Sequence, residues 1–180
     1  MGKTINCISC LLTLVIFFLL PQTATAERAN TSGDAIGKEY VIEKASKLQW
    51  PRMTPRQFVD LLIMGKKIAL VDVRSKMETA VWYPKSDNAM DTYIIPLQEI
   101  PEKLGHIVHP EKYDYVVLTC PTGPRAAAAA VLARLIGYDN VWFFRGGNKK
   151  LGSLTGTAFR KAAERLLREG KIKDVPSWMK

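Results

Sequence analysis

The sequence predicts an α/β fold, a doubly wound and mainly parallel five-stranded sheet flanked by helices. Short apolar runs alternate with helical stretches between residues 50 and 170, as they do when helices connect parallel strands. The apolar runs lack the polar alternation of half-exposed strands, which indicates strands buried on both faces. The length suits one ordinary domain with a sizeable core.

The first elements of this pattern are a helix and a strand. Thr54 is a favourable N-cap and Pro55 suits the first helical turn, so a helix is predicted to begin here. Gly65 marks its end. The short apolar run 68–73 then predicts a buried strand.

The middle of the chain is less regular. Residues 75–91 show no clear periodicity and are predicted to be irregular. The apolar run 93–96, which ends in proline, predicts a short strand. Residues 97–104 are predicted to form a helix that Pro101 interrupts.

Two further strands follow, each with a helix after it. The run 115–119 predicts a buried strand, and 124–136 a helix with proline in its first turn and glycine after its end. The run 140–144 predicts another buried strand. The last helix is expected at 157–169, where apolar residues recur at helical spacing.

The N-terminus has the pattern of a secretory signal peptide. Lys3 precedes an apolar run at 11–20, which is short for a membrane span, and the small residues at 24–26 offer a cleavage site. We therefore expect cleavage after Ala26, a periplasmic or secreted protein, and no stable membrane anchor. An uncleaved N-terminal anchor is the alternative.

Four segments follow from this interpretation. They are a signal peptide at 1–26, a linker or N-terminal extension at 27–49, a domain at 50–170 and a C-terminal tail at 171–180. Without Lys3, the 26 basic residues become 25 against 17 acidic ones, a net charge of +8. Because the basic residues are scattered and export is expected, this charge indicates small anionic partners and no nucleic acid.

Cys120 is the only cysteine outside the predicted signal peptide, since Cys7 and Cys10 lie inside it. It begins the loop 120–125, between a predicted strand and the N-terminus of a helix. Backbone N–H groups and the helix dipole favour an anion there, and Arg125 adds a positive charge. A nucleophilic thiolate in a partly exposed, electropositive loop is therefore predicted. The alternative is a buried structural cysteine.

Several motifs, in this order along the chain, resemble the single-domain rhodanese family of sulfurtransferases. They are Val71-Asp72-Val73-Arg74-Ser75 with Glu78, Ile95-Pro96-Leu97, the C-x-x-G-x-R loop at 120–125, and Gly137-Tyr138-Asp139-Asn140-Val141 leading into Arg145-Gly146-Gly147. The resemblance covers about residues 50 to 170. It implies that Cys120 accepts a sulfane sulfur from a small anionic donor such as thiosulfate. The resulting persulfide would pass this sulfur to a thiol or cyanide.

Five residues are candidates for binding the donor or for orienting the site: Arg125, Thr122, Gly123, Arg74 and Asp72. Thr122, Gly123 and Arg125 supply N–H groups in a loop where Pro121 and Pro124 supply none. The resemblance gives Asp72 and Arg74 a supporting role beside the loop. Alternatively, Asp72 caps local backbone and Arg74 pairs with Glu78.

Other functions leave weaker signals. Phosphatases and arsenate reductases place five residues between a loop cysteine and its arginine, whereas the spacer here has four. A non-catalytic sulfur carrier or binding module for an exported partner is a second alternative. His106 and His109 are too few to predict a metal site, and no cofactor motif is present, so neither metal nor cofactor is expected.

Overall fold

The computed structural model of the protein describes residues 32–85 and 89–180. The predicted signal peptide and its cleavage site lie outside the described residues. The chain divides into two compact units, 1–38 and 39–180, and the boundary falls within helix α1 (Ser32–Ser46). No helix in the described part of the chain is long and apolar enough to cross a membrane.

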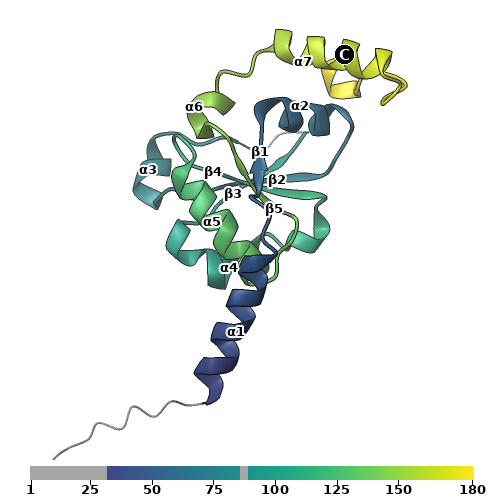
Figure 1. Ribbon diagram of the computed structural model, residues 1–180. Coiled ribbons are helices and arrows are strands. Elements are labelled where there is room, and N and C mark those ends of the chain that lie inside the picture. Colours follow the sequence, from purple (N-terminus) through teal and green to yellow (C-terminus); the bar gives the residue numbers. More distant parts are fainter. Residues whose placement is uncertain (1–31, 86–88) are drawn as a thin grey trace, which may run out of the picture. The chain divides into compact units, whose positions relative to one another are not determined.

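The second unit is built on a parallel sheet of five strands in the order β1-β5-β4-β2-β3 (Figure 1). The strands are β1 (Arg52–Met53), β2 (Ile68–Asp72), β3 (Asp91–Ile94), β4 (Tyr115–Thr119) and β5 (Val141–Phe144). Every pair of neighbouring strands is parallel. The predicted fold class is thus confirmed, and the sheet is wholly rather than mainly parallel.

Helices cover both faces of this sheet. They are α2 (Pro55–Ile63), α3 (Lys76–Val81), α4 (Ile100–Ile107), α5 (Pro124–Leu135), α6 (Gly147–Leu151) and α7 (Gly156–Arg168), with short 3-10 turns η2 (Leu97–Glu99), η3 (Pro110–Lys112) and η4 (Ser177–Met179). Val71 and Leu118 belong to the same core cluster as the buried alanines of α5, whereas Leu70 and Val117 pack with Phe58 of α2. Successive strand residues therefore serve opposite faces.

The prediction that residues 75–91 are irregular is wrong in part, because helix α3 forms within this stretch. Ser75 caps this helix by accepting a hydrogen bond from the Glu78 N–H, and the Glu78 carboxylate accepts one from the Ser75 N–H. This capping box stabilises a helix too short to show periodicity. The spacing of Ser75 and Glu78 was its only sequence signal.

Among the α-helices and strands of the described residues, three others were not predicted from the sequence: α1, β1 and α6. Strand β1 has only two residues, which pair with Phe143 and Phe144 of β5. Strand β3 also begins earlier than predicted, because Asp91 pairs with Ala69 of β2. A two-residue strand is specified by its neighbour in the sheet and leaves no periodic pattern.

The parallel order places the carboxyl ends of all five strands along one edge of the sheet. The chain leaves β1 at Thr54, β5 at Arg145, β4 at Cys120 and β2 at Val73. Ligands of open α/β sheets bind beyond this edge. A ligand-binding site is therefore expected among the residues that follow these strands.

Candidate active site

The loop after β4 turns around the sulfur of Cys120. Gly123 precedes α5 with a φ of 117°, a conformation that side chains disfavour, and its N–H donates a hydrogen bond of 3.1 Å to Cys120 Sγ. The turn that the sequence predicted therefore brings a backbone donor to the thiol. Thr122 is exposed and Arg125 half-buried on the same loop.

Cys120 is more deeply buried than its predicted role suggested. Its exposed fraction is 1%, so the expectation of a partly exposed thiol is wrong for this structure. Cys120 belongs to the core cluster on the α5 face of the sheet, and the segment after β5 also binds the backbone of its loop. Asn148 N–H donates to the Cys120 carbonyl at 2.7 Å, and Lys149 N–H donates to the Pro121 carbonyl at 3.1 Å.

Gly147 permits this close approach. A β-carbon at this position would lie 2.1 Å from the Cys120 carbonyl oxygen, and φ is +57°. Only glycine fits both the space and the backbone conformation. The second glycine of the Gly146-Gly147 pair is therefore part of the architecture of the cysteine loop.

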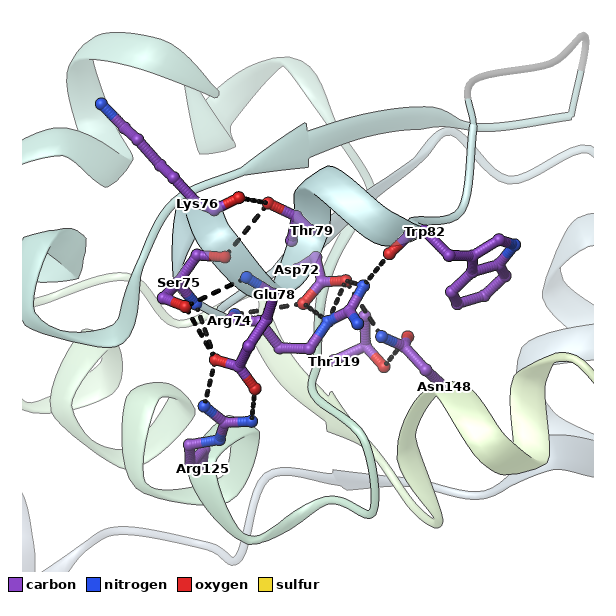
Figure 2. Close-up of polar contacts among 10 residues, drawn as sticks. All are labelled: Asp72, Arg74, Ser75, Lys76, Glu78, Thr79, Trp82, Thr119, Arg125 and Asn148. Carbon is purple, nitrogen blue, oxygen red and sulfur yellow. Dashed lines mark hydrogen bonds and ion pairs between the residues drawn. The ribbon is translucent and has the colours of Figure 1, made fainter.

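Asp72 and Arg74 form a buried ion pair at the end of β2 (Figure 2). Arg74 Nη2 lies 2.7 Å from Asp72 Oδ2, and the same carboxylate accepts hydrogen bonds from the backbone N–H and Nε of Arg74. Arg74 also donates to the Trp82 carbonyl. The supporting pair is thus assembled. Asp72 does cap local backbone, but the alternative pairing of Arg74 with Glu78 is wrong.

Two further polar residues extend this pair toward the loop. Asn148 donates a hydrogen bond of 2.9 Å from Nδ2 to Asp72 Oδ2, and its Oδ1 accepts one of 2.8 Å from Thr119 Oγ1 (Figure 2). All are buried, so each bond forms where water does not compete. Because Thr119 directly precedes Cys120, the network ties the ends of β2 and β4 together.

Sequence reasoning missed Thr119 and Asn148. Asn148 is a single polar residue after a glycine pair, and its partners lie 29 and 76 residues away. No local pattern identifies such a residue. Thr119 was recognised only as the last residue of an apolar strand.

Arg125 is held by Glu78 of α3. Its Nη1 and Nη2 donate to the two carboxylate oxygens of Glu78 at 2.9 and 2.7 Å, a bidentate pair (Figure 2). The Arg125 hydrogen bond, followed by the N–H of Ser75, lowers the pKa of Glu78 to about 2. Glu78 raises the pKa of Arg125, and the nearby Cys120 sulfur contributes to a lesser degree.

This pair changes the predicted electrostatics of the loop. The sequence suggested a positive charge at Arg125, and in the structure a carboxylate offsets that charge. Both residues are partly exposed, at 41% and 39% of their side-chain surfaces, so solvent reaches the pair. The Gly123 N–H, which donates directly to the sulfur, is a donor that no carboxylate offsets.

The two histidines do not approach this site. His106 lies in the last turn of α4, and His109, with a φ of 53°, lies 3.5 Å from Glu111. Within residues 32–85 and 89–180, no group of three potential metal ligands occurs.

The fold and the site together define a class of α/β proteins. In this class a cysteine lies at the carboxyl edge of a parallel sheet, in a loop that ends at an arginine. Residues 54–153 match the family model of the rhodanese-like domain. This protein belongs to the rhodanese-like domain family, as its motifs suggested. No curated protein matches the chain.

Solved structures with similar folds include two single-domain sulfurtransferases. Human TSTD1 is 23% identical, with a TM-score of 0.45, over 58% of this chain and 98% of its own. Saccharomyces cerevisiae RDL2 is 25% identical, with a TM-score of 0.40, over 57% and 88%. RPA3614 of Rhodopseudomonas palustris, described as a possible tyrosine phosphatase, is 20% identical, with a TM-score of 0.44, over 74% and 96%.

Proposed function

We propose that this protein is a sulfurtransferase that carries sulfur as a persulfide on Cys120. It takes the sulfur from an anionic donor such as thiosulfate and passes it to a thiol or cyanide. The observation that carries the proposal is the hydrogen bond from Gly123 N–H to Cys120 Sγ, at the N-terminus of α5. A backbone donor aimed at sulfur stabilises an anion there.

The reaction has two sulfur transfers. The Cys120 thiolate attacks the outer sulfur of thiosulfate, the sulfur–sulfur bond of the donor breaks, and sulfite leaves with the electron pair. Cyanide or a thiolate then attacks the outer sulfur of the persulfide. The bond to Cys120 breaks, thiocyanate or a new persulfide leaves, and the Cys120 thiolate is restored.

The loop suits both transfers because the thiolate and the persulfide are both anions at nearly the same place. Pro121 and Pro124 have no N–H, so the backbone donors of the loop are those of Thr122, Gly123 and Arg125. Gly123 already donates to the sulfur. The network around Asp72 holds the strand ends, and thereby the loop, in place.

The Arg125–Glu78 pair disfavours oxyanion chemistry of the phosphatase type. One N–H of each terminal guanidinium nitrogen donates to Glu78, so the Glu78 carboxylate competes with a tetrahedral oxyanion for this side chain. The short spacer between Cys120 and Arg125 argues in the same direction. We therefore favour transfer of sulfur over transfer of phosphate.

The burial of Cys120 favours one second candidate, a sulfur carrier that retains its persulfide. An exposed fraction of 1% implies that donors and acceptors reach the sulfur only when the loop moves. A carrier would load once and discharge slowly until its partner binds. The lifetime of the loaded protein with and without cyanide separates the carrier from the enzyme.

The intact mass of the protein after incubation with thiosulfate tests the shared first step. We expect a gain of one sulfur atom on the wild type, reversed by cyanide with release of thiocyanate. Cys120→Ser is the matched control and should gain nothing. An unchanged wild-type mass, or the same gain on the serine variant, would contradict the assignment of Cys120.

A further inference from the structure

A positively charged hollow lies beside the cysteine loop. It has a volume of about 650 Å³ and is lined by Pro55, Arg145, Gly146, Lys149, Lys150 and Ser153. Three of these six residues are cationic and none is acidic. Arg145, Lys149 and Lys150 are all exposed. Within the described part of the chain, no carboxylate forms an ion pair with any of them.

The order of the sheet brings this hollow next to Cys120. Pro55 lies just after β1, Arg145 follows β5, and Cys120 follows β4, which are three consecutive strands along one edge. Backbone contacts confirm the proximity. Lys149 N–H donates to the Pro121 carbonyl, and a β-carbon on Gly123 would lie 3.5 Å from Gly146 N.

The positive surface continues away from the loop. A second hollow of about 560 Å³ shares Pro55, Lys150 and Ser153 with the first. It adds Arg56, Lys161 and Arg168, which are exposed and form no ion pair within the described residues. Two acidic residues also line it, Glu164 and Asp60, and Asp60 is already paired with Arg165. An excess of positive charge therefore extends over α2, α6 and α7.

We propose that this surface docks an acidic segment of the thiol-bearing protein that receives sulfur from Cys120. The exposed cations belong to three different helices and the strand end at Arg145, so they do not converge on one small ion. Spaced charges of this kind suit several carboxylates along an extended chain. This proposal rests on the proposed function and names the class of its acceptor.

Docking would raise the local concentration of the acceptor thiol at the loop. The thiolate of the bound protein attacks the outer sulfur of the Cys120 persulfide. The bond between the two sulfur atoms breaks, and Cys120 leaves as a thiolate with the electron pair. The acceptor then carries the persulfide, and no oxidant or reductant is consumed.

Binding is tested first, on the unloaded protein, with a fluorescent peptide of alternating glutamate and serine that ends in cysteine. The matched peptide has glutamine at each glutamate position. We expect only the acidic peptide to bind, and its affinity should fall as salt shortens the Debye length from about 30 Å at 0.01 M to about 8 Å at 0.15 M. Equal binding of both peptides would overturn the proposal.

The double variant Lys149→Gln/Lys150→Gln should lower the affinity for the acidic peptide about three- to tenfold at low salt. The control is Lys66→Gln/Lys112→Gln, which removes the same charge at the amino ends of β2 and β4, on the opposite edge. Equal losses in both variants would show a general effect of net charge and overturn the site. Displacement by sulfate at equal charge concentration, or tighter binding to phosphatidylglycerol vesicles, would also overturn it.

Sulfur transfer is measured next. The persulfide form should discharge several-fold faster to the acidic thiol peptide than to the neutral one, and Lys149→Gln/Lys150→Gln should remove that difference. Equal discharge to both peptides by a wild type with normal thiosulfate and cyanide turnover refutes only the docking surface. If the wild type does not load sulfur at all, the proposed sulfurtransferase function is refuted, and the docking role falls with it.

Discussion

The side-chain amide of Asn148 donates a hydrogen bond of 2.9 Å to the buried carboxylate of Asp72, although 76 positions separate the two residues. The same amide accepts from Thr119 at its other end. Asn148 therefore joins three segments: the end of β2, the end of β4 and the start of α6. A single side chain links the architecture of the domain to the position of Cys120.

Asn148→Ala should therefore destabilise the protein and disturb the loop together. The variant removes one donor from Asp72 and leaves Thr119 Oγ1 without its acceptor, which costs about 1–3 kcal/mol for buried groups. Urea unfolding measures the loss, and sulfur loading measures the loop. Ser153→Ala, at an exposed residue nearby, is the control. A change within experimental error for Asn148→Ala would show that the network contributes nothing.

Gly147→Ala should be more severe. The new β-carbon would meet the Cys120 carbonyl at 2.1 Å at a φ of +57°, so the turn after β5 must move away from the loop. Backbone strain and overpacking together predict a loss of about 2–4 kcal/mol. Gly156→Ala is the matched control, because a β-carbon there meets nothing within 4 Å. Similar stabilities for the two variants would contradict the tight approach at Gly147.

The elements that the sequence predicted correctly are those with strong local signals. Strand β4 is a continuous apolar run, and α5 begins with Pro124 and is followed by Gly137, so both were found. Strand β1 was missed because two residues carry no period, and its existence depends on pairing with Phe143. Local patterns show where an element lies only when the element is long enough to repeat.

The residues of the candidate site also fall into those with a local sequence signal and those without one. Cys120, Gly123 and Arg125 could be predicted, because a strand–loop–helix junction has a recognisable local sequence. The partner of each charged residue could not be predicted from the sequence, because the tertiary structure selects it. Glu78 was within reach of Arg74 along the chain, yet it pairs with Arg125. The folded backbone directs Arg74 to Asp72, where the carboxylate is buried.

The pKa of Glu78 predicts how stability depends on acid. The carboxyl group has an ordinary pKa of 4.5 and a folded-state pKa of about 2, held down chiefly by Arg125. A depressed pKa gives stability that is complete above pH 4.5 and lost as the pH falls toward 2. Glu78→Gln should therefore lose less melting temperature between these pH values than the wild type. Parallel melting curves for the two proteins would contradict this contribution of the pair.

Export and cleavage at the N-terminus are a separate prediction. The short apolar run and the small residues before Glu27 predict cleavage after Ala26. Expression with the native leader, followed by N-terminal sequencing of the extracytoplasmic fraction, should give Glu27 as the first residue. Ala26→Pro is expected to block processing and is the control. A retained Met1 in the membrane fraction would favour the uncleaved anchor instead.

The pairing of Arg125 with Glu78 makes a prediction that neither residue alone would suggest. Arg125→Ala leaves the Glu78 carboxylate uncompensated beside the loop, so the KM for thiosulfate should rise by about tenfold or more through repulsion of the anionic donor. Removing Glu78 as well should restore part of this loss, so that Glu78→Gln/Arg125→Ala loads thiosulfate better than Arg125→Ala. A neutral persulfide donor, assayed in parallel, should show a smaller effect of Arg125→Ala, because it is not repelled. If the double variant is as impaired as Arg125→Ala with both donors, Arg125 acts by holding the shape of the loop, and its charge has no part in loading.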